Sequence, residues 1–223
     1  MSRYVVNGPS RFAVRGRAHA CEWARAGDPP GKSRRFRHWP FAALVALLLA
    51  FAGWQLGGAA WVHAKAVLAQ HLIASAWAGA GGDGARRPWP WADTRPVARL
   101  AVPSRGVSLY VLAGTSGRSL AFGPGHLEGT APPGTAGNSV IVAHRDTHFA
   151  FLRDLRENDE ITVEDARGGL TRYRVREAVV VDKRDMRLLD PADSPQLTLV
   201  TCWPFDAVQP GSAARYVVIA DRA

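Results

Sequence analysis

The sequence predicts a mainly β domain, closed or nearly closed as a barrel or sandwich, preceded by one membrane-spanning helix. From residue 88 onward, short β-prone runs are separated by Gly, Pro, Asn and Asp, and no βαβ alternation occurs. Residues 39–62 contain no Asp, Glu, Lys, Arg or His over 24 positions. At about 1.5 Å per helical residue this segment spans ~36 Å, which exceeds a hydrocarbon core of about 30 Å.

The net charge of +9 is unevenly distributed along the 223 residues. Residues 1–40 contain nine Lys/Arg and two Asp/Glu, whereas the rest of the chain contains 19 Lys/Arg and 17 Asp/Glu. A nucleic-acid-binding domain carries its positive charge across a folded surface, so this pattern argues against nucleic acid as a partner. We expect residues 1–38 to form a basic cytoplasmic arm whose role is not legible from its composition.

The apolar segment 39–63 is predicted to be a retained signal anchor. A soluble core helix would need polar residues on its outer face, and only Gln55 is available. A cleavable signal peptide could end at Ala64, but an n-region of 38 residues exceeds the usual pattern. The arginines within 34–37 place the N-terminus in the cytoplasm, although Lys65 weakly opposes this bias. We therefore expect a single pass through the cytoplasmic membrane, with the C-terminal domain on its extracytoplasmic side.

The remainder of the chain is expected to divide into a linker and one domain. Residues 64–87 are first Ala-rich and then Gly-rich, which favours a helical extension followed by a flexible segment. In the domain 88–223, only 147–155 is typical of a helix, with an apolar face of Phe149, Phe151, Leu152 and Leu155. The predicted strands are 97–102, 108–112, 120–122, 139–144, 161–163, 171–181, 196–202 and 215–221.

Cys202 ends the predicted strand 196–202, and the even-numbered residues of that strand share one face. Pro204 cannot donate a ladder hydrogen bond, so the strand should stop there. A lone cysteine in a strand is more commonly a buried structural residue. However, Cys21 lies on the other side of the predicted membrane helix and cannot pair with Cys202. An unpaired thiol in an oxidising compartment is a liability unless it is used, so a nucleophile becomes as plausible as a core thiol.

A reactive thiol needs a partner that activates it and usually a donor for an oxyanion. The domain offers His126, His144 and His148. His144 ends the apolar run 139–144 as Cys202 ends its own strand, whereas His126 lies in a turn and His148 opens the predicted helix. A zinc site built from these residues is the main chemical competitor, but the His144–His148 pair spans a strand-to-helix junction and no CxxC or HExxH accompanies it. No metal is therefore expected.

The residues around Cys202 carry a family resemblance. Thr198-Leu199-Val200-Thr201-Cys202 matches the TLxTC signature of sortases, and Arg215, thirteen residues further on, matches the sortase arginine on the next strand. The segment 121–145 resembles the stretch that leads into the sortase catalytic histidine, here His144. Stretches 89–94, 96–100, 144–149 and 202–206 resemble the proteobacterial, Gram-negative class of sortases. The resemblance covers residue 88 to the end, with Ala143 where Gly is common and Trp203 where Tyr is common.

The resemblance implies a closed, sortase-like eight-stranded β-barrel with one or two short helices and a cysteine transpeptidase activity without a cofactor. Cys202 would attack a peptide bond in the C-terminal, LPxTG-like sorting signal of a secreted protein and form a thioester. His144 would act as acid and base, and Arg215 would hold the substrate or the oxyanion. An amine would then resolve the thioester; neither this amine nor the secreted protein can be identified from the sequence.

Further candidates and alternatives accompany this interpretation. Three residues near the motifs are candidates for substrate binding: His126, Thr201 and Trp203. Asp146 could orient the imidazole of His144, although an Asp at a strand end is more commonly a solvated turn residue. A membrane-tethered cysteine endopeptidase would use the same thiol and imidazole, whereas a non-catalytic β-barrel binding module would need neither.

Overall fold

The computed structural model describes residues 39–79, 86–207, 209 and 211–223. The basic arm 1–38, Cys21 and residues 80–85 of the expected linker lie outside the described residues. The first element is a single helix, α1 (Trp39–Ala78), which continues through residue 63, where the membrane segment was expected to end. Its length and composition are sufficient to cross a membrane.

The two halves of α1 differ in how much of their apolar surface is buried. Large apolar side chains in the first half are exposed, among them Phe51 at 61% and Trp54 at 81%. Near the C-terminal end, Ala69, Ile73 and Ala76 are buried. These three residues are spaced by four and three positions, so they form one stripe on the helix surface.

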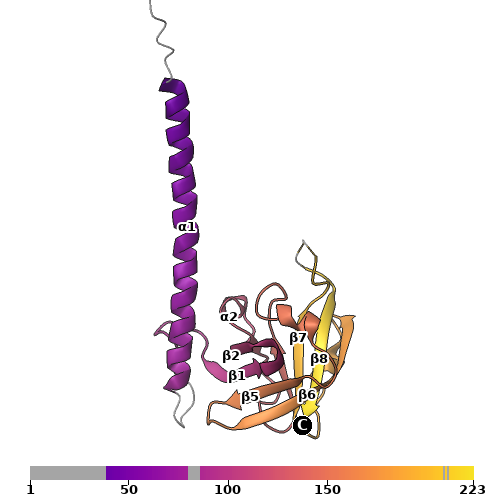
Figure 1. Cartoon of the computed structure of the whole chain (residues 1–223). Helices are drawn as coiled ribbons and strands as arrows, with labels where there is room; N and C mark the ends of the chain where they lie inside the picture. Colours follow the sequence, from indigo (N-terminus) through magenta and orange to yellow (C-terminus); the bar gives the residue numbers. More distant parts are fainter. Residues whose placement is uncertain (1–38, 80–85, 208, 210) are drawn as a thin grey trace, which may run out of the picture. The chain divides into compact units, whose positions relative to one another are not determined.

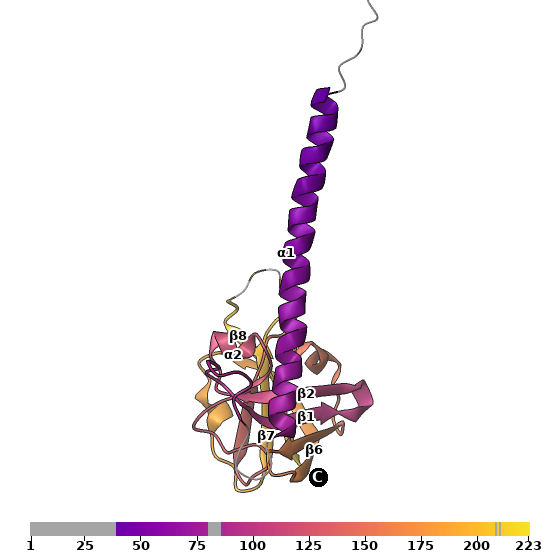
Figure 2. The ribbon, with the colours of Figure 1, turned by 90° about the vertical axis from the view of Figure 1, so that its left-hand side faces the viewer.

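Eight strands close into a barrel in the order β1-β2-β3-β4-β7-β8-β6-β5, which confirms the predicted fold class (Figures 1 and 2). Closure pairs the edge strands with each other, so the described barrel has no open sheet edge. The strands are β1 (Pro96–Val102), β2 (Val107–Ala113), β3 (Gly125–His126), β4 (Asn138–Val142), β5 (Glu160–Asp165), β6 (Leu170–Asp182), β7 (Gln196–Cys202) and β8 (Ala214–Arg222).

Strand directions decide which chain segments meet at each end of the barrel. Two of the eight pairs are parallel, β2–β3 and β4–β7, and the others are antiparallel. Parallel strands need a long crossover connection, which residues 143–195 supply and which contains β5 and β6. As a result, β4 and β7 end side by side, at the end of the barrel where β8 begins.

Alternate residues of β4, β7 and β8 separate into two apolar clusters on opposite faces of the sheet. The barrel interior contains Ile141, Leu197, Leu199 and Val218, all fully buried. The other face carries a smaller cluster, here called the outer cluster. Its buried members are Val140, Val200 and Val217, with Leu127, Val142, Val179, Val181, Leu188, Leu189 and Ile219 packed against them.

The predicted strand 120–122 is wrong. A short helix, α2 (Gly117–Leu120), ends at the first residue of this range, and a turn follows at 121–122. The hydroxyl of Ser116 accepts a hydrogen bond from the Ser119 amide at 3.2 Å and caps the first turn of this helix. The strand lies instead at β3, which the sequence pattern missed. A Cβ atom on Gly125 would overlap the carbonyl oxygen of Gly114, so glycine is required where β3 approaches the end of β2.

The helix predicted at 147–155 is shorter and tighter than expected. It is the 3₁₀ helix η2 (Ala150–Asp154), in which hydrogen bonds join residues three apart, such as Leu155 to Leu152. Its predicted apolar face is nevertheless buried at Phe149, Leu152 and Leu155, and partly at Phe151. Two other 3₁₀ helices lie in connections: η1 (Pro103–Arg105) and η3 (Met186–Leu189).

Candidate active site

Cys202 is the last residue of β7 and lies on the outer face of the barrel. Val200, two positions earlier, belongs to the outer cluster, and alternate residues of a strand point to the same side. The Cys202 thiol is partly exposed and unpaired. The prediction that the even-numbered residues of this strand share one face is therefore confirmed, and the thiol is accessible rather than sealed in the core.

The strand register aligns Cys202 with His144 and Arg215. Cys202 and Arg215 are direct partners across the antiparallel pair β7–β8. In the parallel pair β4–β7, Val142 pairs with Val200, so two residues further along His144 is level with Cys202. The Ala143 amide donates to the Val200 carbonyl at 3.2 Å, which carries this alignment beyond the formal end of β4.

Thr201 fixes the junction between the two segments. Its side chain is buried, and its hydroxyl donates to the Ala143 carbonyl at 2.8 Å, one residue before His144. The hydroxyl of Thr201 is thus turned inward and already hydrogen-bonded, and contact of Thr201 with substrate stays a prediction. Thr201 holds the end of β4 against the end of β7.

His144 is exposed just after β4, and a second imidazole lies close to it. The Phe149 amide donates to the His144 carbonyl at 3.0 Å, which folds the segment into a turn. Burial lowers the pKa of His148 below its usual value, and the charge of His144 lowers it further. The His148 Nδ1 atom lies 3.3 Å from the Thr147 hydroxyl. The sequence pattern had left any role for His148 open.

Arg215 lies at the start of β8, and its guanidinium contacts the preceding loop. Its Nη1 atom donates to the carbonyls of Ser212 at 2.8 Å and Ala214 at 2.9 Å. A guanidinium carries five N–H donors, so these two bonds leave donors for a further acceptor. The site thus presents a thiol, an imidazole and a guanidinium on neighbouring strand ends.

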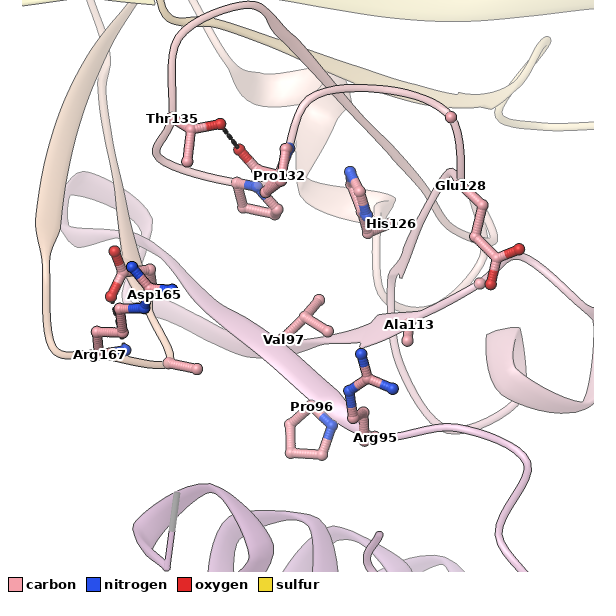
Figure 3. A pocket seen from close by; sticks show the side chains of 14 residues that line it. Arg95, Pro96, Val97, Ala113, His126, Glu128, Pro132, Thr135, Asp165 and Arg167 are labelled. Atoms are coloured by element: carbon pink, nitrogen blue, oxygen red, sulfur yellow. Dashed lines mark hydrogen bonds between the residues drawn. The ribbon is translucent and has the colours of Figure 1, made fainter. Parts of the chain in front are cut away.

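His126 is not brought to this site. It pairs with Ile141, whose side chain lies in the barrel interior, and its Nε2 atom is 2.9 Å from the Ala131 carbonyl and 3.1 Å from the Thr130 hydroxyl. Figure 3 shows His126 at a pocket of about 620 Å³ that Arg95 and Glu128 also line. Since none of the three aligned residues lines this pocket, the expected substrate-binding role of His126 has no support in the structure.

Trp203 belongs to an aromatic group at the rim of the barrel. Its ring stacks on Tyr216 with centroids 5.6 Å apart, and Phe205 contacts both rings edge-on. Together with Arg153 these rings line a pocket of about 690 Å³. Trp203 is adjacent to Cys202 in the chain, and its contact with substrate stays a prediction.

The part of the chain that the structure describes contains no group of side chains arranged to bind a metal ion. No three His, Cys, Asp or Glu side chains are grouped there in a way that could hold an ion. A zinc site from the three histidines and Cys202 would need His126 on the outer face, whereas it shares the inward direction of Ile141.

Two features of the site were missed by sequence reasoning. Arg145 is buried beside His144, and its guanidinium donates to three backbone carbonyls of the loop after Cys202. Asn138 is buried at the start of β4, and its amide donates to the carbonyls of Leu188 at 2.9 Å and Asp190 at 3.2 Å. In the sequence, each of these residues is recognisable only as a polar residue next to an apolar strand. That pattern does not identify the carbonyls that they contact, which lie about 50 to 60 residues away in the chain.

A closed mixed β-barrel with a thiol, an imidazole and a guanidinium on one outer face defines a cysteine-centred site on a rigid scaffold. The family model of the sortase domain matches residues 100–223, more than half of the chain. This protein therefore belongs to the sortase family.

Named relatives agree with this membership. The chain is 30% identical over 125 residues to sortase D of Bacillus subtilis (strain 168), covering 55% of this chain and 62% of that protein. It is 29% identical over 110 residues to sortase A of Listeria monocytogenes, covering 48% of this chain and 49% of that protein. The chain thus spans less than two thirds of the length of the first of these curated relatives and about half of the second.

Solved structures show the same fold. Sortase A from Corynebacterium diphtheriae superimposes with a TM-score of 0.54 at 34% identity, covering 60% of this chain and 63% of that chain. Sortase C-1 from Actinomyces oris superimposes with a TM-score of 0.53 at 32% identity, covering 59% and 76%.

Proposed function

We propose that this protein is a membrane-anchored cysteine transpeptidase that cleaves a C-terminal, LPxTG-like sorting signal of a secreted protein and transfers the cleaved protein to an amine. The observation that carries this proposal is the alignment of His144, Cys202 and Arg215 at adjacent strand ends. Membership of the sortase family supports the thiol as the nucleophile.

In the first half-reaction, Sγ of Cys202 attacks the carbonyl carbon of the scissile peptide bond. The imidazole of His144 protonates the leaving nitrogen, the C–N bond breaks, and a thioester remains on Cys202. In the second, an acceptor amine gives a proton to His144 and attacks the thioester carbonyl, so that Sγ leaves. Arg215, which stays charged, donates to the oxyanion or to a carbonyl of the signal.

The outer cluster supports binding of an apolar signal next to Cys202. Leu188 and Leu189 of the β6–β7 connection are only partly buried where they pack on this cluster. Asn138 fixes the connection through the carbonyls of Leu188 and Asp190, and its own side-chain oxygen accepts from the Thr198 hydroxyl at 2.8 Å. We infer that the apolar residues of the signal contact Leu188 and Leu189.

The membrane-spanning role of α1 is part of the same proposal. Its apolar first half and the basic residues 32–37 before it favour an N-terminus in the cytoplasm and a barrel on the extracytoplasmic side. Placement in the Gram-negative class, and hence in the periplasm, rests on the motifs around His144 and Cys202. The relatives compared above are Gram-positive sortases.

Intact mass spectrometry tests the reaction. The full chain in detergent micelles is incubated with a peptide that carries an LPxTG-like signal, and the expected result is an acyl adduct on Cys202 that is lost in Cys202→Ala. A folded wild-type sample that forms no adduct with any such peptide contradicts the proposal.

The fate of the adduct separates the remaining alternatives. Added hydroxylamine or a glycine peptide should be incorporated into the product of a transpeptidase, whereas an endopeptidase yields only the free acid. A binding module would still retain the peptide after Cys202→Ser, and alkylation of the thiol would not change its function.

A further inference from the structure

Arg145 is a charged side chain buried at the edge of the site. It follows His144 directly, and its side chain is only 7% exposed. Taking a guanidinium out of water is costly unless hydrogen bonds replace its hydration. A buried arginine at this position is therefore stable only if hydrogen-bond acceptors surround its guanidinium.

The acceptors are backbone carbonyls of the loop 203–213. Nη1 donates to the Pro204 carbonyl at 2.6 Å, and Nη2 donates to the carbonyls of Ala207 at 2.5 Å and Gln209 at 3.5 Å. Among the residues that the structure describes, its only charged partner is Asp146, whose exposed carboxylate is 3.2 Å from Nε. Since that ion pair is solvated, the loop carbonyls are the contacts that account for burial.

The loop depends on Arg145 for its attachment. Within the described residues 204–207 and 209, every hydrogen bond to the rest of the protein comes from Arg145. Phe205 adds ring contacts with Trp203 and Tyr216. The Arg153 guanidinium also lies over the Phe205 ring, 5.0 Å from its centroid. Without the Arg145 guanidinium, the first half of the loop would be held by these contacts of Phe205, with no hydrogen bond from its described residues to the rest of the protein.

The same loop joins the other two aligned residues, because Cys202 precedes it and Arg215 follows it. We propose that Arg145 is a positioning residue that fixes this loop against the His144 segment and so holds Cys202 and Arg215 in register with His144. Its own atoms need not touch the substrate. This inference rests on the proposed function for its effect on turnover.

The side-chain type follows from the geometry. Three carbonyls spread over six residues must be reached from one point, and the planar fork of arginine offers donors in separate directions. A lysine ammonium at this position could reach only part of the set. We therefore expect Arg145→Lys to retain part of the kcat and part of the loop protection from hydrogen exchange that Arg145→Gln loses.

Steady-state kinetics of full-length variants with the LPxTG-like peptide and hydroxylamine tests the assignment. Rates are normalised to the amount of titratable Cys202 thiol and measured well below the unfolding transition of each variant. For Arg145→Gln we expect kcat to fall about 10- to 100-fold with KM within about twofold, because small displacements of reacting groups have effects of this size. Hydrogen exchange of the loop 203–213 should become faster.

Arg105→Gln is the matched control. The Arg105 guanidinium also donates to a backbone carbonyl, that of Asp154, and pairs with Asp159 at 3.5 Å, but it has no contact with the loop 203–213. This variant should lose stability without a change of more than about twofold in kcat.

Three outcomes decide the matter. If Arg145→Gln keeps the wild-type kcat per thiol, or lowers stability as Arg105→Gln does and nothing more, the positioning role is overturned. If it fails to fold, Arg145→Lys carries the same comparison, and a wild-type kcat with unchanged loop exchange overturns the proposal. If the wild type forms no adduct, the proposed function fails, but the positioning role of Arg145 can still be tested by hydrogen exchange of the loop and by the alkylation rate of Cys202. Faster exchange confined to the loop in Arg145→Gln, together with an altered alkylation rate, supports the positioning role. No change in either measurement overturns it.

Discussion

Cys202 and Arg215 are direct partners across the antiparallel pair of β7 and β8, so the thiol and the guanidinium leave the sheet at the same level. Eleven loop residues close the connection between these two strands. The carbonyls of Ser212 in the loop and of Ala214 at the start of β8 already accept hydrogen bonds from Arg215. A substrate carbonyl that enters beside Cys202 therefore meets a guanidinium whose direction is set by its own loop.

Arg215→Lys should reduce kcat/KM by about 100-fold or more, because an ammonium cannot bond the loop carbonyls and a substrate oxygen in the same fork geometry. The measurement is the rate of thioester formation with the signal peptide. Arg222→Lys, at the exposed far end of the same strand, should leave this rate unchanged. A wild-type rate in Arg215→Lys would reduce Arg215 to a structural residue.

Asn138→Ala should lower the free energy of unfolding by about 1–3 kcal/mol, since it leaves the carbonyls of Leu188 and Asp190 without their donor. It should also raise KM for the signal peptide, because the connection that carries Leu188 and Leu189 loosens. Chemical denaturation and steady-state kinetics measure the two effects.

Thr198→Val is the control for this variant. It removes the hydroxyl that donates to Asn138 but leaves the two bonds from Asn138 to the connection. It should therefore lower stability with little change in KM. Equal changes of KM in both variants would contradict the role assigned to Asn138.

His148 should make the protein less stable at acidic pH. Its folded-state pKa lies below the usual value of 6.5, so the folded protein binds this proton less readily than the unfolded chain does. The stability due to neutral His148 is present above about pH 6.5 and is lost as the pH falls through the lowered pKa. Between about pH 7.5 and about pH 5, the Tm of the wild type should fall more than that of His148→Gln. Identical falls in the two proteins would refute the assignment.

Gly125→Ala should destabilise the barrel by about 1–3 kcal/mol or more, because the new Cβ would overlap the backbone of Gly114 where β3 meets β2. Gly117→Ala, at a helical position with open space around it, should cost nothing or stabilise slightly. Thermal unfolding of the two variants gives the comparison. A neutral Gly125→Ala would show that β3 can move away from β2.

The parts of the fold that follow from local pattern were predictable from the sequence. Seven of the eight strands lie where alternation and turn residues placed them, with ends shifted by two residues or fewer. The shared face of Val200 and Cys202 also followed from period-two alternation, whereas only the structure shows that this is the outer face. The short strand β3 was missed because two residues carry no periodicity, and a capping Ser116 favoured a helix just before it.

The parts that depend on distant contacts could not be predicted in this way. The parallel pairing of β4 with β7 sets His144 level with Cys202, and no local pattern specifies strand order. Arg145 and Asn138 hold loops through carbonyls between 50 and 64 residues away in the chain. Thr201 and His126 were assigned to substrate because they lie near motifs. In the structure the Thr201 hydroxyl bonds the Ala143 carbonyl, and the His126 imidazole bonds the Ala131 carbonyl of the β3–β4 connection.

The parallel pairing of β4 and β7 also has a consequence for when the thiol becomes reactive. Residues 143–195, which include β5 and β6, separate the two strands in the chain, so the pairing is a non-local contact that the chain makes only on folding. An incompletely folded chain therefore carries Cys202 far from His144, as an ordinary thiol. His144 and Arg215 come level with the thiol only in the closed barrel, so the acyl transfer proposed for Cys202 depends on the completed fold.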